Sequence, residues 1–119
     1  MIPNSLVAVV DDDESVRESL PDLLREFGFT ATAFDSGEAF LASPFLDHAR
    51  CLVLDVAMPG MSGPMLQAEL KRRGHAIPIV FITAHHDPAL CSRLIAGGAV
   101  DCLFKPFTDA ALLQAVRKA

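Results

Sequence analysis

Cysteine is scarce in this chain of 119 residues, which has three, at Cys51, Cys91 and Cys102. The count is odd, and the spacing does not match that of metal ligands such as those of zinc sites. We therefore expect reduced, mostly buried thiols in a reducing compartment.

Long apolar runs are also missing, since no run approaches the roughly 18–20 residues that span a bilayer. The first five residues lack the basic stretch of a secretory signal, so we expect a cytoplasmic chain without a membrane partner. Linkers, low-complexity tracts and internal repeats are absent too, and the length suits one domain over residues 1–119.

The chain also has no excess of positive charge, because 15 acidic residues outnumber 10 Lys and Arg and give a net charge of −5. This balance disfavours nucleic-acid binding by this domain itself, since phosphate backbones require clustered cations. The composition is 51% hydrophobic with a mean hydropathy of +0.36, which favours an α/β protein with a covered sheet over a disordered chain.

Five short apolar or β-branched runs predict strands, at residues 6–10, 30–34, 51–55, 77–82 and 99–104. Helical patterns separate and follow them, at about 14–27, 38–42, 64–73, 88–96 and from 109 onward. Regular alternation with short links predicts a parallel sheet with right-handed crossovers.

The first helix is expected to have Asp13 near its N-cap and to end at Gly28. Pro21 lies inside this pattern and removes a backbone hydrogen bond, so we predict a kink near residues 16–17. Two helices present apolar residues that we expect to face the core: Val16, Leu20, Leu23, Leu24 and Phe27 in the first, and Met65, Leu66 and Leu70 in the third.

Polar groups stand at the ends of four predicted strands: Asp11 and Asp12, Asp55, Thr83 and Lys105. Each alone has an ordinary explanation as a turn residue, a strand-end hydroxyl or a solvated charge. Parallel topology places all four strand ends on one edge, and the order 2-1-3-4-5 makes the strands before Asp11 and Asp55 neighbours at the switch point.

Three carboxylates so close together repel one another, and a hard divalent cation would relieve the repulsion. Mg²⁺ accepts oxygen ligands and commonly uses one or two carboxylates together with phosphate oxygens. We expect Asp11, Asp12 and Asp55 to hold Mg²⁺, with one of Asp11 and Asp12 binding it through water and the backbone carbonyl of Ala57 as a further ligand.

A carboxylate, a hydroxyl and an ammonium beside a metal suit phosphoryl transfer. Asp55 would be the nucleophile that forms an acyl phosphate. Lys105 and Thr83 would bind the phosphoryl oxygens and neutralise their charge. The adjacent His85 and His86 cannot share one helix face, which argues against a metal role for them.

Four segments in this order, residues 10–14, 54–63, 81–84 and 104–107, closely resemble the receiver domain of two-component response regulators. The resemblance covers nearly the whole chain. It implies a flavodoxin-like, doubly wound parallel sheet of five strands in the order 2-1-3-4-5, with five helices.

The resemblance further implies that a histidine kinase phosphorylates Asp55 in the presence of Mg²⁺ and that the domain dephosphorylates itself without being an enzyme in its own right. It implies a cis peptide before Pro106. It also implies a shift of the face formed by the fourth helix, the fifth strand and the fifth helix, and dimerisation through this face upon phosphorylation. The loop at residues 61–63 and the turn at residues 35–37 look like those of receivers attached to helix-turn-helix DNA-binding domains, so we expect either an excised or a stand-alone receiver.

One switch position departs from the family pattern. Many receivers carry an aromatic residue three positions before the lysine. This aromatic side chain moves inward together with the hydroxyl residue at the position that Thr83 occupies here. This chain has Cys102 there, and a thiol cannot fill the same space. We expect switching to depend more on backbone movement of the loop after Thr83.

Three other functions compete with this interpretation. A haloacid-dehalogenase-like phosphatase would require a second Asp where Ala57 stands. A flavodoxin-type FMN binder would require a phosphate cradle after the first strand, where the acidic residues 11–13 would repel a phosphate. A receiver fold that acts as a protein-interaction module without phosphorylation is the third alternative, against which the intact site residues argue.

Overall fold

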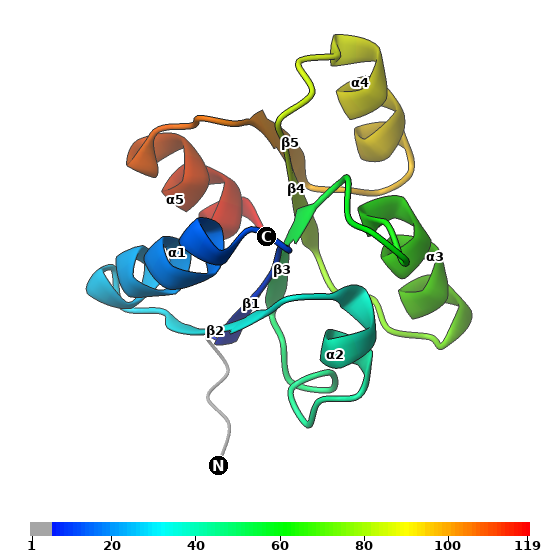
Figure 1. Cartoon of the computed structure of the whole chain (residues 1–119), viewed down its shortest axis with the longest axis horizontal. Coiled ribbons are helices and arrows are strands. Elements are labelled where there is room, and N and C mark those ends of the chain that lie inside the picture. The colour runs from blue at the N-terminus through cyan, green and yellow to red at the C-terminus, as the bar shows by residue number, and fades with distance from the viewer. Residues whose placement is uncertain (1–5) are drawn as a thin grey trace.

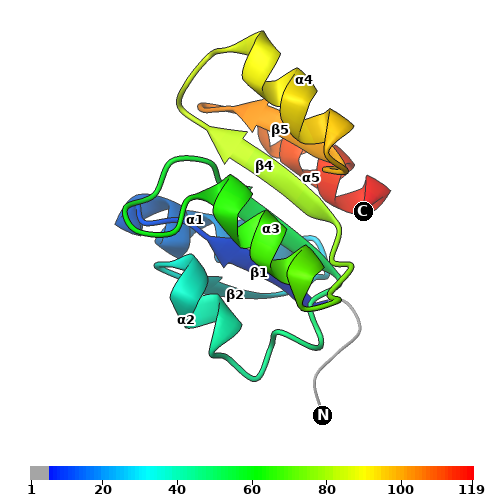
Figure 2. The same cartoon turned by 90° about the vertical axis from the view of Figure 1, so that its right-hand side faces the viewer.

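The computed structural model describes residues 6–119, a central sheet covered on both faces by helices (Figures 1 and 2). Residues 1–5, from which the absence of a secretory signal was inferred, lie outside the described part. The strands pair in parallel in the order β2-β1-β3-β4-β5, which confirms the predicted topology. Their bounds are β1 (Leu6–Val10), β2 (Thr30–Phe34), β3 (Cys51–Asp55), β4 (Ile79–Thr83) and β5 (Asp101–Phe104).

Five helices alternate with the strands, as the sequence predicted: α1 (Glu14–Glu26), α2 (Gly37–Leu41), α3 (Gly63–Arg72), α4 (Pro88–Ala96) and α5 (Asp109–Lys118). The helices α1 and α5 cover one face of the sheet, and α2, α3 and α4 cover the other (Figure 1). Each helix begins after an oxygen-bearing side chain that accepts a backbone N–H of the first turn, which satisfies one orphan donor. These N-cap residues are Asp13, Ser36, Ser62, Asp87 and Thr108.

The strands β4 and β5 begin two residues later than predicted. Pro78 has no N–H to donate, although its carbonyl accepts from the Leu52 N–H at 2.9 Å. The Val100 N–H still donates to the Ile79 carbonyl at 2.8 Å. The residues that lead into β4 and β5 are therefore hydrogen-bonded to the neighbouring strands β3 and β4 without having regular strand geometry.

Two apolar layers form the core, one on each face of the sheet. Both β1 and β3 are buried over their whole length, as expected of parallel strands covered on two faces. The core prediction was wrong for Phe27, which is 47% exposed at the C-cap of α1, and for Met65, which is 54% exposed on α3. The helix α1 continues through Pro21, which is buried, and the predicted kink stays a prediction.

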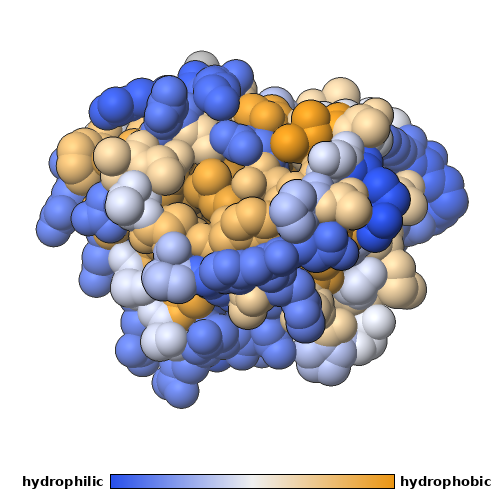
Figure 3. Space-filling model, turned by 90° about the horizontal axis from the view of Figure 1, so that it is seen from above, coloured by the Kyte–Doolittle hydropathy of each residue, from blue (hydrophilic) through white to orange (hydrophobic). Residues whose placement is uncertain are grey.

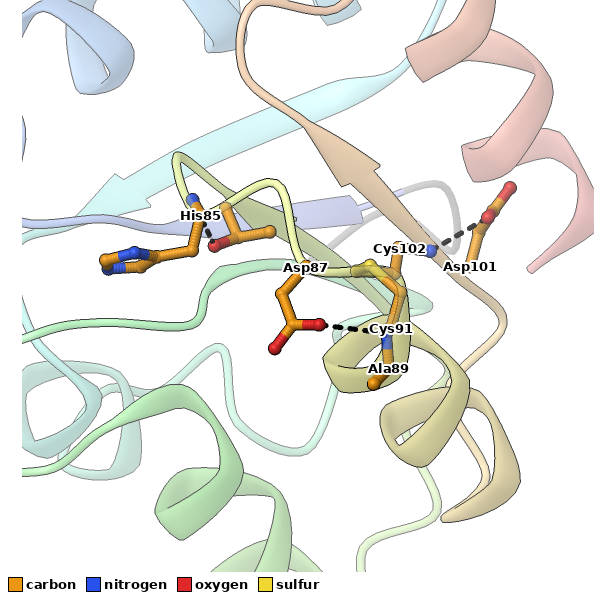
Figure 4. Close-up of a disulfide and its surroundings, with 7 residues drawn as sticks. His85, Asp87, Ala89, Cys91, Asp101 and Cys102 are labelled. Carbon is orange, nitrogen blue, oxygen red and sulfur yellow. Dashed lines mark hydrogen bonds between the residues drawn. A yellow bond between two sulfur atoms is a disulfide. The ribbon is translucent and has the colours of Figure 1, made fainter.

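The expectation of reduced thiols was wrong for two cysteines. Cys91 on α4 and Cys102 on β5 form a disulfide, with their Cα atoms 5.5 Å apart, a usual separation for such a bond. The sequence shows no disulfide spacing because the two residues meet only when α4 packs over β5 (Figure 4). Within residues 6–119, Cys51 is the free cysteine, and it is buried in β3 as predicted.

None of the helices within residues 6–119 combines the length and the apolar character that crossing a membrane would require.

Candidate functional site

The carboxyl ends of four strands bring the predicted site residues to one edge of the sheet. Asp11 directly follows β1, Asp55 is the last residue of β3, and Thr83 is the last residue of β4. The register aligns Val10 with Leu54 and Thr83 with Phe104, so Lys105 follows β5 at the same level. The fold therefore places the polar groups together because apolar strands of matched length end side by side.

Lys105 joins the two buried carboxylates of this edge. Its Nζ donates to Asp11 Oδ2 at 2.7 Å and lies 3.4 Å from Asp55 Oδ1. Asp11 is fully buried and Asp55 nearly so, and a buried charge is stable only when it is paired. Burial alone would lower the pKa of Lys105, but the hydrogen bond and charge of Asp11, with the charge of Asp55, outweigh it and raise that pKa. The ammonium therefore stays charged and holds the two carboxylates in place.

The Asp55 carboxyl titrates well above its usual range. Its pKa is raised from 3.8 to about 6, chiefly by burial and further by the negative charge of Asp11. The Lys105 ammonium acts in the opposite direction and limits the shift. At neutral pH most of the Asp55 carboxylate is still ionised, in an environment that favours any group able to neutralise it.

The carboxylates of Asp11, Asp12 and Asp55 form an acidic cluster, with one oxygen of each within 4.8 Å of the others. Asp12 is exposed to solvent, whereas Asp11 and Asp55 are buried. A donor set made only of carboxylate oxygens, open to water on one side, fits a hard cation such as Mg²⁺ and does not fit Zn²⁺. Ala57 lies two residues beyond Asp55, and its carbonyl as a further ligand stays a prediction.

Thr83 is buried at the end of β4, and its hydroxyl accepts the His85 N–H at 3.0 Å. The neighbouring strands place it near Asp55, because Asp55 pairs with Ile82 in the register. The hydroxyl is thus hydrogen-bonded to the loop before α4, and it connects the acidic edge to that loop.

Two contributors to the site were missed by the sequence reasoning. A Cβ at Gly63 would collide with the Asp55 carbonyl oxygen, and the Gly63 N–H donates to the Val56 carbonyl at 2.9 Å. Only glycine therefore allows α3 to begin against the end of β3, and the glycine at the end of the loop was the available signal.

The second missed contributor is His86, which was expected in a loop without a role. Its Nε2 lies 2.8 Å from the Lys105 carbonyl oxygen, and its ring stacks on Phe104 with centroids 5.0 Å apart. Nothing in the sequence pairs residues of the loop before α4 with the end of β5. The peptide bond that follows, between Lys105 and Pro106, is cis.

The sequence also matches a known family along most of its length. The profile of the family described as "Response regulator receiver domain" matches residues 7–117. The chain belongs to this family. Membership places this receiver domain among regulators of two-component systems rather than among conventional enzymes.

Several curated relatives resemble the receiver domain in sequence. Nodulation protein W of Bradyrhizobium diazoefficiens is 49% identical over 112 residues, which are 94% of this chain and 49% of that protein. The transcriptional regulatory protein FixJ of Azorhizobium caulinodans is 44% identical over 117 residues, covering 98% and 56%. Response regulator protein TodT of Pseudomonas putida is 42% identical over 115 residues, covering 97% and 51%. The chain spans about half the length of the curated relatives it matches.

Solved structures show the same fold. The response regulator StyR superposes with a TM-score of 0.85 at 49% identity, over 95% of this chain and 57% of the other. The structure called FixJ-N superposes with a TM-score of 0.86 at 38% identity, over 98% and 94%. The receiver domain therefore shares its flavodoxin-like fold with receivers of transcriptional regulators.

Proposed function

We propose that this receiver domain is a phosphorylation switch in which Asp55 accepts a phosphoryl group from a histidine kinase. The observation that carries the proposal is the pairing of Asp55 with the Lys105 ammonium beside the carboxylates of Asp11 and Asp12. A nucleophilic carboxylate, a fixed cation and a cation-binding cluster meet at one strand edge, and phosphoryl transfer requires this combination.

In the proposed reaction, an oxygen of the Asp55 carboxylate attacks the phosphorus of a phosphohistidine. The P–N bond breaks, and its electron pair leaves with the imidazole, which takes up a proton. The product is an acyl phosphate on Asp55. The Lys105 ammonium, already within 3.4 Å of Asp55, would donate to a phosphoryl oxygen, and the Thr83 hydroxyl would do the same after leaving the His85 N–H.

Asp11, Asp12 and Asp55, with the backbone carbonyl of Ala57, would hold Mg²⁺. When bound, this ion supplies positive charge that neutralises the phosphoryl oxygens. Without it, Lys105 is the one cation that contacts both buried carboxylates in the described part of the chain. Attack of water on the acyl phosphate would return Asp55 to its free form, so the chain would limit the lifetime of its own signal.

The output would pass from Thr83 to the face formed by α4, β5 and α5. Figure 3 views the molecule from above, the side on which α4 lies, and shows hydrophobic surface surrounded by hydrophilic side chains. This chain covers 56% and 51% of two relatives named as transcriptional regulatory proteins, FixJ of Azorhizobium caulinodans and TdiR of Thauera aromatica. We therefore propose a cytoplasmic role in which this face acts on a DNA-binding effector domain, of the helix-turn-helix type, or on a second copy of the receiver.

The test is incubation with acetyl phosphate and Mg²⁺, followed by intact mass spectrometry. The wild type should gain one phosphoryl group, and Asp55→Ala should gain none. Asp11→Ala should lose both the labelling and its dependence on Mg²⁺. Asp35→Ala removes an exposed carboxylate after β2, at the same edge but outside the cluster, and should be labelled like the wild type. Equal labelling of Asp55→Ala and wild type would refute the assignment, and a chain that is never labelled would favour the interaction module.

A further inference from the structure

The disulfide between Cys91 and Cys102 joins two elements of the proposed output face. Cys91 lies in the first half of α4, and Cys102 is the second residue of β5 (Figure 4). Cys102 pairs with Phe81 in the register, and its side chain packs against the apolar layer under α3 and α4. The bond therefore fixes the helix to the strand on which it rests.

The same bond restrains the loop at residues 84–87, which connects β4 with α4. At its start, the His85 N–H binds the Thr83 hydroxyl. In its middle, His86 contacts the ring of Phe104, the last residue of β5, and the carbonyl of Lys105, which follows it. At its end, Asp87 caps α4 by accepting the Ala89 N–H. The noncovalent contacts can exchange when Thr83 moves, but the disulfide cannot, so it limits how far the start of α4 can leave β5.

The position of the pair permits chemistry that Cys51 does not allow. Cys102 is partly exposed and Cys91 is 9% exposed, whereas Cys51 is fully buried on the opposite face of the sheet. Burial also raises the pKa of the Cys51 thiol to about 12, which leaves almost no thiolate to react. Cys51 is therefore an internal control, a buried thiol that should not take part in the exchange.

We propose that Cys91 and Cys102 form a reversible thiol–disulfide modification site that determines whether α4 can respond to phosphorylation of Asp55. The oxidised pair holds α4 against β5, and the reduced pair releases it. The gating half of this inference rests on the proposed function, whereas the reactivity of the pair does not.

The co-reactant is a low-molecular-weight disulfide of the glutathione class. The Cys102 thiolate attacks one of its sulfurs, the S–S bond breaks, and one thiol leaves, giving a mixed disulfide on Cys102. The Cys91 thiolate then attacks the Cys102 sulfur and expels the second thiol. Two protein thiols lose two electrons, one small disulfide gains them, and the two protons leave on the released thiols. A dithiol reductant reverses the sequence.

The first experiment tests the pair itself. The whole chain is equilibrated in mixtures of reduced and oxidised glutathione, quenched in acid, unfolded and alkylated with iodoacetamide, and its mass is measured. The reduced wild type should carry alkyl groups on all three cysteines, and the oxidised one only on Cys51. Cys51→Ser should lose one label in both states. Cys91→Ser and Cys102→Ser cannot form this bond, so neither variant should show the mass decrease of two hydrogens that accompanies disulfide formation. A wild type fully alkylated at every glutathione ratio would overturn the proposal.

The second experiment tests the gating. Hydrogen exchange of the α4 amides is compared with and without acetyl phosphate and Mg²⁺, in oxidised and reduced chains. Phosphorylation should change exchange over residues 88–96 in the reduced wild type, and oxidation should abolish that change. In Cys91→Ser or Cys102→Ser, oxidant should not alter the exchange change that phosphorylation causes. One of these two variants is sufficient if the other does not fold. Equal responses of oxidised and reduced wild type would overturn the gating.

The failures are distinguishable because the phosphoryl mass gain is measured in the same samples. A reduced wild type that gains no phosphoryl group refutes the proposed function and the gating together. The alkylation count still decides whether the pair is a redox site.

Discussion

The edge formed by β1 and β3 and the region formed by β4, α4 and β5 are built on different principles. At the first edge, two buried carboxylates are paired with one lysine, and the contacts between the polar side chains are ion pairs. In the second region, a disulfide, an aromatic stack and a hydroxyl connect the elements. In the proposed function a phosphoryl group adds charge, so it would act directly on the first edge and would reach the second region through Thr83 and Lys105. The chemistry and the response can therefore be altered separately.

The largest effect is expected when the lysine of the acidic edge is removed. Lys105→Ala leaves Asp11 and Asp55 facing each other without a cation and takes a donor from the phosphoryl oxygens. We expect the rate of labelling by acetyl phosphate to fall about 100-fold, with some labelling retained. Lys118→Ala is the matched control, because Lys118 also pairs with an aspartate, Asp101, at 3.3 Å but away from this edge. A similar loss of labelling in both variants would show that the Lys105 pairing has no special role.

A smaller effect on stability should distinguish the second region. Opening the disulfide frees a loop of 11 residues in the unfolded chain and should lower the free energy of unfolding by about 2–3 kcal/mol. Urea titrations with and without a dithiol reductant measure this difference. The same reductant should leave the stability of Cys91→Ser unchanged, and a change there would assign the effect to something other than the bond.

The acidic edge should also have a pH-dependent stability when Mg²⁺ is absent. The folded chain raises the pKa of Asp55 from 3.8 to about 6, so it binds this proton more tightly than the unfolded chain does. The resulting stabilisation is complete below about pH 4 and is lost as the pH rises through about 6. Asp55→Asn removes the buried charge, so its free energy of unfolding should be about 1–3 kcal/mol higher than that of the wild type at pH 7 to 8.

Thermal unfolding across this pH range tests the sign of that effect. The advantage of Asp55→Asn should shrink at pH 4 and should also shrink when Mg²⁺ is added to the wild type. An advantage of equal size at pH 4 and pH 8 would mean that the ionisation of Asp55 is not its cause.

The smallest effect is expected from the aromatic contact in the second region. His86→Ala removes the stack on Phe104 and the contact with the Lys105 carbonyl, and should lower stability by about 0.5–1 kcal/mol. His85→Ala is the control, because His85 is hydrogen-bonded to Thr83 through its backbone N–H rather than its ring. Chemical denaturation measures the stability of both variants. Equal losses of stability in the two would contradict a specific role for the His86 ring.

The acidic edge was predictable from sequence because it depends on which residue ends each apolar run and on the parallel order of the strands. Apolar runs end in Asp11, Asp55 and Thr83, and parallel strands carry those ends to the same side. The second region was not predictable in the same way. The disulfide and the stacking of His86 depend on how α4 and its loop rest on β5, and no periodicity in the sequence encodes that placement. Phe27 and Met65 show the same limit, because helical spacing fixes a face but not how far the covering extends.

The close approach of Gly63 to the Asp55 carbonyl fixes one side of the acidic site. Because the beginning of α3 has no clearance against the end of β3, the two cannot slide past each other when the Asp55 side chain is modified. We therefore expect a displacement caused by phosphorylation to occur in the loop before α4, which contacts the Thr83 hydroxyl, the Lys105 carbonyl and the Phe104 ring. Modification of Asp55 would thus displace the side of the site next to α4 and leave the side next to α3 in place.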